Sequence, residues 1–169
     1  ARQDLDKAIS AGANDPTAFY YRGNLRFKAE DRAGAIADYD KAEAAGATDN
    51  AVLYNNRGKA KLLSQHAAAS IADFDKAIAL RTDYGKAFEN RGVAHYETTN
   101  PAKAIADLEK ARSLGSTDRS ILRMLAYAKY SSGDKEGAKK DLDEVIRQGL
   151  KEKEAFLYRG TLYYEAESW

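Results

Sequence analysis

Apolar and small residues recur along this chain with the spacing of one helix face. Ala104, Leu108 and Ala111, for example, lie three or four residues apart with charged residues between them. This period predicts amphipathic α-helices and not strands. Interruptions of the pattern place ten helices at about 2–12, 17–29, 33–45, 51–64, 67–80, 84–98, 101–114, 119–131, 135–148 and 152–167.

Residues typical of helix ends support several of these boundaries. Gly12 closes the first predicted helix, where glycine readily takes the left-handed conformation that ends a helix. Asp15 and Asn100 each precede a proline. This order suits a capping side chain followed by a proline in the first helical turn.

Two sets of small residues repeat along the chain with the same period. A small residue early in each unit recurs at a nearly constant interval, at Gly23, Gly58, Gly92, Ala126 and Gly160. A second set keeps the same interval near the end of each unit, at Ala8, Ala42, Ala77, Ala111 and Val145. A period of about 34 residues predicts stacked helical hairpins, each burying its apolar side against its neighbours.

These marks resemble the tetratricopeptide repeat family over essentially the whole chain. A large apolar residue lies four positions before each small one, at Phe19, Tyr54, Phe88, Leu122 and Phe156. The chain departs from the family pattern in carrying arginine before the glycine, at Arg22, Arg57, Arg91 and Arg159, where leucine is usual. It also lacks the proline that usually ends a unit, and has Ala47, Thr82 and Ser116 there.

The resemblance implies an all-α fold, a right-handed superhelical solenoid of antiparallel helix pairs. We expect one array over 1–169, with half a repeat at 1–13, full repeats at 16–50, 51–84, 85–118 and 119–151, and another half at 152–169. The first half repeat matches the second helix of a unit, and the last matches the first helix. We therefore expect this chain to be part of a longer array.

Composition excludes several kinds of partner and chemistry. The formal charge of +1 favours neither a nucleic acid nor an anionic membrane as a partner. With no cysteine, the chain has no disulfides or thiolate metal sites. No apolar run approaches the length of a membrane span.

The arginine before each glycine has two candidate partners. One is an aspartate in the second predicted helix of the same unit, which pairs Arg22 with Asp38, Arg57 with Asp73 and Arg91 with Asp107. The other is an aspartate of the preceding unit, which pairs these arginines and Arg159 with Asp4, Asp38, Asp73 and Asp141. Either arrangement is more typical of a structural ladder than of an active site.

No group of residues predicts catalysis or a bound cofactor. The paired aspartates, such as Asp38 and Asp40, lie two apart on a helix and so face different sides. The two histidines, His66 and His95, accompany no nucleophile or metal-ligand motif, and we interpret both as surface or packing residues. We expect neither enzyme activity nor a metal or cofactor.

The resemblance implies that the first helix of each hairpin lines a concave groove. The candidate groove residues combine tyrosine rings with asparagine amides, a mixture suited to binding a peptide backbone. They are Tyr20, Tyr21, Asn24, Asn55, Asn56, Lys59, Lys86, Glu89, Asn90, Arg123, Tyr127 and Tyr158. A second row on the same helices is interpreted mainly as packing between hairpins, at Phe27, Leu62, Tyr96, Tyr130 and Tyr164.

Some family members grip the terminal carboxylate of a partner with two lysines, two asparagines and an arginine. Asn24, Asn56 and Lys86 match three of these positions, but Tyr20 and Asn90 replace two of the cations. We therefore expect no such clamp here. The predicted function is binding of another protein or peptide in the groove. The alternative is a scaffold that acts through its convex face or its ends, including self-association through exposed terminal helices.

Overall fold

The computed structural model describes residues 2–117, 119–149 and 153–167. Ten α-helices and no strands are present in these ranges. They are α1 (Arg2–Ser10), α2 (Pro16–Lys28), α3 (Arg32–Ala44), α4 (Ala51–Leu63), α5 (Ala67–Leu80), α6 (Gly85–Glu97), α7 (Pro101–Ser113), α8 (Arg119–Ser132), α9 (Lys135–Arg147) and α10 (Lys153–Glu167).

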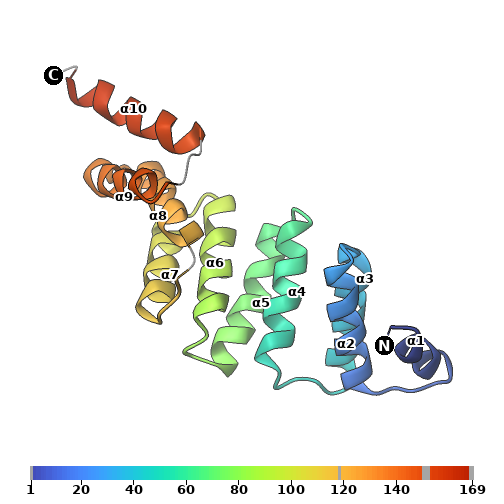
Figure 1. Ribbon diagram of the computed structural model, residues 1–169. Coiled ribbons are helices and arrows are strands. Elements are labelled where there is room, and N and C mark those ends of the chain that lie inside the picture. The colour runs from blue at the N-terminus through green and yellow to red at the C-terminus, as the bar shows by residue number, and fades with distance from the viewer. Residues whose placement is uncertain (1, 118, 150–152, 168–169) are drawn as a thin grey trace.

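The helices form a row of antiparallel hairpins stacked along one direction (Figure 1). The pairs α2–α3, α4–α5, α6–α7 and α8–α9 make the largest contacts, and each second helix also packs on the first helix of the next pair. The backbones of successive first helices lie close together, whereas in the described ranges those of successive second helices do not. The first helices therefore lie on the inner side of the curve, and the predicted all-α solenoid is confirmed.

The small residue of each hairpin lies where its two helices cross. A Cβ atom added to Gly92 would come within 2.8 Å of Leu108 Cγ, and one on Gly58 within 2.7 Å of Phe74 Cε1. The facing side chains are fully buried, one in each hairpin, at Tyr39, Phe74, Leu108 and Leu142. A Cβ atom at Gly58 or Gly92 would therefore not fit unless the facing side chain moved, whereas the fourth hairpin has Ala126 at this place. At Gly160, on α10, no atom of the described residues lies within 4 Å of an added Cβ atom.

Most helix ends lie within one residue of their predicted positions, and the caps explain several of them. Gly12 has φ +94°, as expected for a residue that ends a helix. The Asp15 side chain accepts a hydrogen bond from the backbone N–H of Thr17. Asn100 also precedes its helix, but its side chain makes no capping hydrogen bond, so the prediction of a capping side chain is wrong there.

The arginine ladder pairs within each hairpin and also between hairpins. Arg57 contacts Asp73 of its own hairpin at 2.6 Å and Asp40 of the preceding one at 2.8 Å. Both kinds of bond recur for Arg22, with Asp38 and Asp6, and for Arg91, with Asp107 and Asp75. Arg159 reaches Asp143.

The predicted partners in the preceding unit were therefore wrong by two residues. The ladder uses Asp6, Asp40, Asp75 and Asp143 in place of Asp4, Asp38, Asp73 and Asp141. The reason is the helix geometry: aspartates two residues apart face different sides, so one points into its own hairpin and the other toward the next.

Candidate functional site

The inner face in its N-terminal part is occupied by a chain of asparagine side chains that links three repeats. Asn24 Oδ1 accepts hydrogen bonds from Tyr39 Oη at 2.8 Å and from Asn56 Nδ2 at 3.0 Å. Asn55 Nδ2 donates to Asn56 Oδ1 at 3.3 Å, and Asn90 Nδ2 donates to Asn55 Oδ1 at 2.8 Å. The asparagines on α2, α4 and α6 thus connect neighbouring hairpins.

This network limits which predicted groove residues are open to a partner. Asn55, Glu89 and Asn90 are buried, whereas Asn24 and Asn56 are half-buried. Burial raises the pKa of Tyr39, which keeps its hydroxyl protonated as the donor to Asn24. On this half of the face, solvent therefore reaches mainly the exposed edges of Asn24 and Asn56 and the neighbouring side chains.

Three aromatic residues and two lysines surround the asparagine chain. Tyr21 is 54% exposed and lies beside Tyr20, with ring centroids 5.3 Å apart. Lys59 Nζ lies 5.9 Å from the centre of the Phe27 ring. Lys86 is exposed, but its ammonium pairs with the buried Glu89 carboxylate at 2.5 Å. That partner neutralises much of the charge that a clamp for a terminal carboxylate needs.

The inner face changes character in its C-terminal part, where α8 and α10 meet. Tyr158 stacks on Tyr130 at 4.6 Å and meets the edge of Tyr127 at 4.9 Å. Tyr127 is buried, and Arg123, on the same helix, is half-buried. Burial raises the pKa of Tyr158. This part of the face presents tyrosine rings in place of asparagine amides.

Neither histidine lies in a constellation that suggests chemistry. His66 is exposed at the start of α5, and its side chain makes no capping hydrogen bond. His95 is buried, and its Nε2 lies 3.8 Å from Asp107 Oδ2. In the part of the chain that the structure describes, no three potential ligands gather in a way that would hold a metal ion. No helix there is long and apolar enough to cross a membrane.

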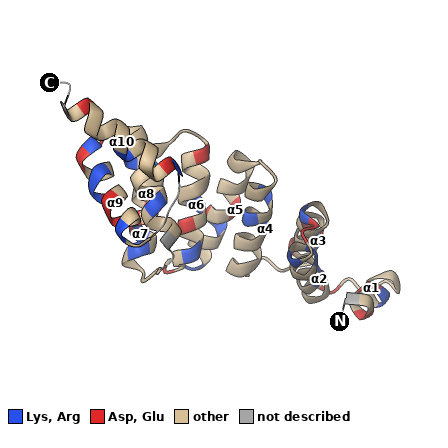
Figure 2. Cartoon of the chain, turned by 45° about the horizontal axis from the view of Figure 1, so that its top comes forward, with Lys and Arg blue, Asp and Glu red and all other residues tan. Residues whose placement is uncertain are grey.

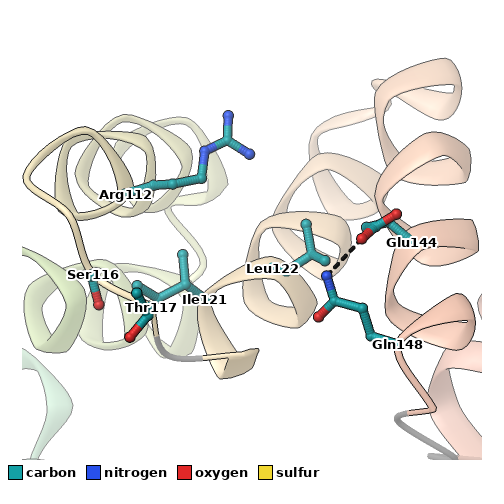
Figure 3. Close-up of a pocket in the computed structure, with 7 residues that line it drawn as sticks. All are labelled: Arg112, Ser116, Thr117, Ile121, Leu122, Glu144 and Gln148. Carbon is teal, nitrogen blue, oxygen red and sulfur yellow. Dashed lines mark hydrogen bonds between the residues drawn. The ribbon is translucent and has the colours of Figure 1, made fainter.

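Sequence reasoning missed a second feature, a cavity of about 300 Å³ between α7 and α9 (Figure 3). Arg112, Leu122 and Glu144 are among the residues that line it. A signal for it is present in the sequence, because Leu122 is the only non-aromatic member of the row Phe19, Tyr54, Phe88, Leu122 and Phe156.

The stacked hairpins, the close helix crossings and the polar inner face define a helical-repeat protein. The model of the tetratricopeptide repeat family matches residues 55–119 and 123–169, about two thirds of the chain. The chain therefore belongs to the tetratricopeptide repeat family, whose repeats typically form protein-interaction modules and not enzymes.

Solved structures of the family share the fold. YrrB, described as a tetratricopeptide repeat protein with an unusual peptide-binding site, superimposes with a TM-score of 0.83 at 22% identity, over 99% of this chain and 86% of that one. MamA gives 0.80 at 22% identity, over 89% and 87%. The first such domain of Spaghetti (RPAP3), bound to the HSP90 peptide SRMEEVD, gives 0.67 at 25% identity, over 70% and 94%. No curated protein matches the sequence.

Proposed function

We propose that this chain binds an extended or helical segment of a partner protein along the inner face formed by α2, α4, α6 and α8. The observation that carries the proposal is that polar and aromatic side chains on these helices share one face and stay partly accessible. Tyr20, Asn24 and Asn56 are half-buried, and Tyr21 and Lys86 are exposed. Tyrosine rings bury large areas at low entropic cost, and amides bond both groups of a peptide backbone.

Two structural relatives support this proposal by their own ligands. RPAP3 holds an HSP90 peptide, and YrrB has a peptide-binding site. The face in this chain differs from one built to grip a carboxylate, because Tyr20 and Asn90 stand where cations would be needed and Lys86 is paired with Glu89. The bound segment is therefore recognised along its length and not by its terminus.

The experiment is an array of extended peptides probed with the intact protein and with three variants. Tyr21→Ala and Lys86→Ala remove exposed groups from the inner face, whereas Lys110→Ala removes an exposed lysine from the second helix α7. We expect the first two variants to lose peptides that the Lys110→Ala control retains. Equal retention by all three variants would place binding elsewhere.

Amidation of the bound peptides tests the mode of recognition. Because the inner face lacks two cations of a carboxylate clamp, we expect amidated and free peptides to bind alike. An acidic peptide that binds tightly and loses its binding on amidation would contradict this reading.

A second candidate is self-association through the ends of the array. On α10 the side chains of Phe156, Leu157, Tyr163 and Tyr164 are 44%, 65%, 40% and 76% exposed, more apolar surface than the other helices present. Exposed apolar patches of this kind mark interaction surfaces. Sedimentation at several concentrations tests this role. The Tyr21→Ala and Lys86→Ala variants should associate as the native chain does, whereas Leu157→Ser should not.

A further inference from the structure

A crevice separates the second helices of successive repeats, and the first helix between them sends one side chain into it. That side chain is the residue four positions before the small one, an aromatic ring in the first three full repeats and Leu122 in the fourth. The crevice between α3 and α5 and the one between α7 and α9 are therefore the same place in the fold with different contents.

Tyr54 fills the crevice between α3 and α5. Its ring is almost fully buried, and its hydroxyl donates to Glu43 Oε1 at 2.9 Å. Lys76 Nζ lies 5.1 Å from the ring centre and bonds Glu43 at 2.8 Å. Burial alone would raise the pKa of Glu43, but hydrogen bonds from Lys76, Arg57 and Tyr54 outweigh it and lower that pKa to about 2. The crevice is closed by a ring, a carboxylate and a cation.

The crevice between α7 and α9 carries the same kinds of group but lacks the ring. Arg112 occupies the position of Glu43, one residue after the small residue near the end of its unit, and Glu144 occupies the position of Lys76, one residue before that small residue. The two charges are exchanged between the helices, and the shorter Leu122 replaces Tyr54. The result is the open cavity of about 300 Å³ between Arg112 and Glu144 (Figure 3).

Both charged groups at this cavity remain available to a ligand. In the part of the chain that the structure describes, the Arg112 guanidinium has no ion pair or hydrogen bond, and the close-up shows it reaching toward the gap (Figure 3). Glu144 accepts hydrogen bonds from Arg147 at 2.7 and 2.8 Å and from Gln148 at 2.6 Å. Since a carboxylate offers about four acceptor sites, one is left for another donor.

We propose that this cavity receives a tyrosine side chain from a partner protein, in the manner that Tyr54 occupies the closed crevice. The ring would lie on Ile121 and Leu122, with the Arg112 guanidinium over its face. Its hydroxyl would donate to Glu144, as Tyr54 donates to Glu43. Thr117 also lines the cavity, and its counterpart Thr48 lies beside the Tyr54 hydroxyl, with its carbonyl oxygen 3.5 Å away.

The other crevices do not offer this combination. Phe88 fills the crevice between α5 and α7, where Ile78 and Lys110 occupy the positions of Glu43 and Lys76. A cavity of about 420 Å³ lies between α1 and α3, but Phe19 and Lys41 line it opposite the apolar Ile9. A cation and a carboxylate face each other across an unfilled space at α7–α9. This site is distinct from the inner face, so it does not depend on the proposed function.

The test uses the intact protein and the peptide Ala-Ala-Tyr-Ala-Ala, with phenylalanine and leucine versions as controls. Binding is followed by NMR shifts of the Ile121 and Leu122 methyl groups. We expect the tyrosine peptide to give saturable shifts at millimolar concentrations. The phenylalanine version should bind about threefold more weakly, because it lacks one hydrogen bond. The leucine version should give none.

Four variants locate the ring. Leu122→Phe restores the aromatic residue of the other repeats and should abolish the shifts of Ile121 without lowering the melting temperature. Arg112→Gln should weaken binding about threefold by removing the cation over the ring. Glu144→Gln should reduce the preference for tyrosine over phenylalanine. Tyr21→Ala, on the inner face, should change nothing, which separates this site from the proposed groove.

Several results would overturn the proposal. They are an absence of shifts up to about 10 mM peptide, equal binding of the tyrosine and leucine peptides, and native binding by Leu122→Phe. If Leu122→Phe proves misfolded, the other two variants take its place. The proposal is then overturned if Arg112→Gln binds the tyrosine peptide as the native chain does and Glu144→Gln keeps the native preference for tyrosine over phenylalanine. Shifts that arise from raising the protein concentration alone, and vanish in Tyr164→Ala, would place a second copy in the cavity instead.

Discussion

The first three full repeats and the fourth build the same hairpin from different residues at three positions. The first three have glycine at the helix crossing, arginine before it and an aromatic ring three residues before the arginine. The fourth has Ala126, Leu125 and Leu122 at these positions. Its helices α8 and α9 nevertheless pair in the same way as the others.

The buried aspartate of each hairpin shows what is kept when these positions change. Asp73 is held by both Arg57 and Lys61, the latter at 2.7 Å. Among the described residues, Asp141 of the fourth repeat pairs with Lys129 alone, at 2.7 Å, because Leu125 replaces the arginine and is buried. The fold therefore requires a cation on the aspartate but not a ladder of arginines.

Basic and acidic residues are interspersed along the whole array (Figure 2).

Removing the aspartate gives the largest difference between the two kinds of repeat. Asp73→Asn leaves Arg57 buried with an incomplete set of partners, so we expect a loss of about 3 kcal/mol in the free energy of unfolding. In Asp141→Asn, only Lys129 loses its partner, and its flexible stem can carry the ammonium to solvent. We therefore expect a loss of about 1 kcal/mol in the free energy of unfolding. Urea unfolding of both variants measures the two losses. Equal losses would show that a hairpin with the arginine ladder depends on its buried aspartate no more than the fourth hairpin does.

The helix crossing gives an intermediate effect. Gly92→Leu forces a side chain against Leu108 and the backbone of Ala104, so we expect a loss of about 1–3 kcal/mol despite the better helix propensity of leucine. Gly160→Leu is the matched control, because a Cβ atom there has no described neighbour within 4 Å. The control should melt no lower than the native chain. A Gly92→Leu variant that melts with the control would refute the close-packing account.

His95 gives the smallest effect, and it concerns pH. The other full repeats have a permanent cation at the position equivalent to His95, at Arg26, Lys61 and Lys129. Each of these cations lies within 3.0 Å of the buried aspartate of its hairpin. Burial lowers the pKa of His95, and Arg91 and Lys103 lower it further, against the opposing pull of Asp107 and Asp75.

The direction of the pH dependence follows from that lowered pKa. As the pH falls, His95 takes up its proton first in the unfolded chain, at its ordinary pKa near 6.5. The stability that comes from keeping His95 neutral is therefore complete above pH 6.5 and is lost as the pH falls through the lower pKa of the folded chain. We expect melting temperatures to fall more steeply below pH 6.5 in the native chain than in His95→Lys, which restores the permanent cation. Parallel melting curves over this pH range would contradict the expectation.

Much of the fold was predictable because it rests on local periodicity. The spacing of small and apolar residues gave the helices and their pairing, since each hairpin can bury its apolar face only against its neighbours. The caps at Gly12 and Asp15 are local as well. The missing side-chain bond at Asn100 and the shift of the ladder by two residues were not predictable, because both depend on how the side chains of packed helices are oriented.

The candidate sites were less predictable. Sequence spacing placed Asn55, Glu89 and Asn90 on the inner face, but only the packing of neighbouring repeats buries them and commits the two asparagines to one another. The groove assignments and the repeat boundaries therefore remain predictions. The cavity beside Leu122 had a visible signal in the aromatic row, but its two opposed charges come from separate helices.

The sequence by itself determined the helices, the repeat period and the family, because these follow from the order of apolar, small and capping residues along one chain. Tertiary structure decided which aspartate each arginine contacts, which asparagines hydrogen-bond one another between repeats and where a crevice stays open. Those outcomes depend on side-chain distances across separate helices, and a one-dimensional pattern does not contain such distances.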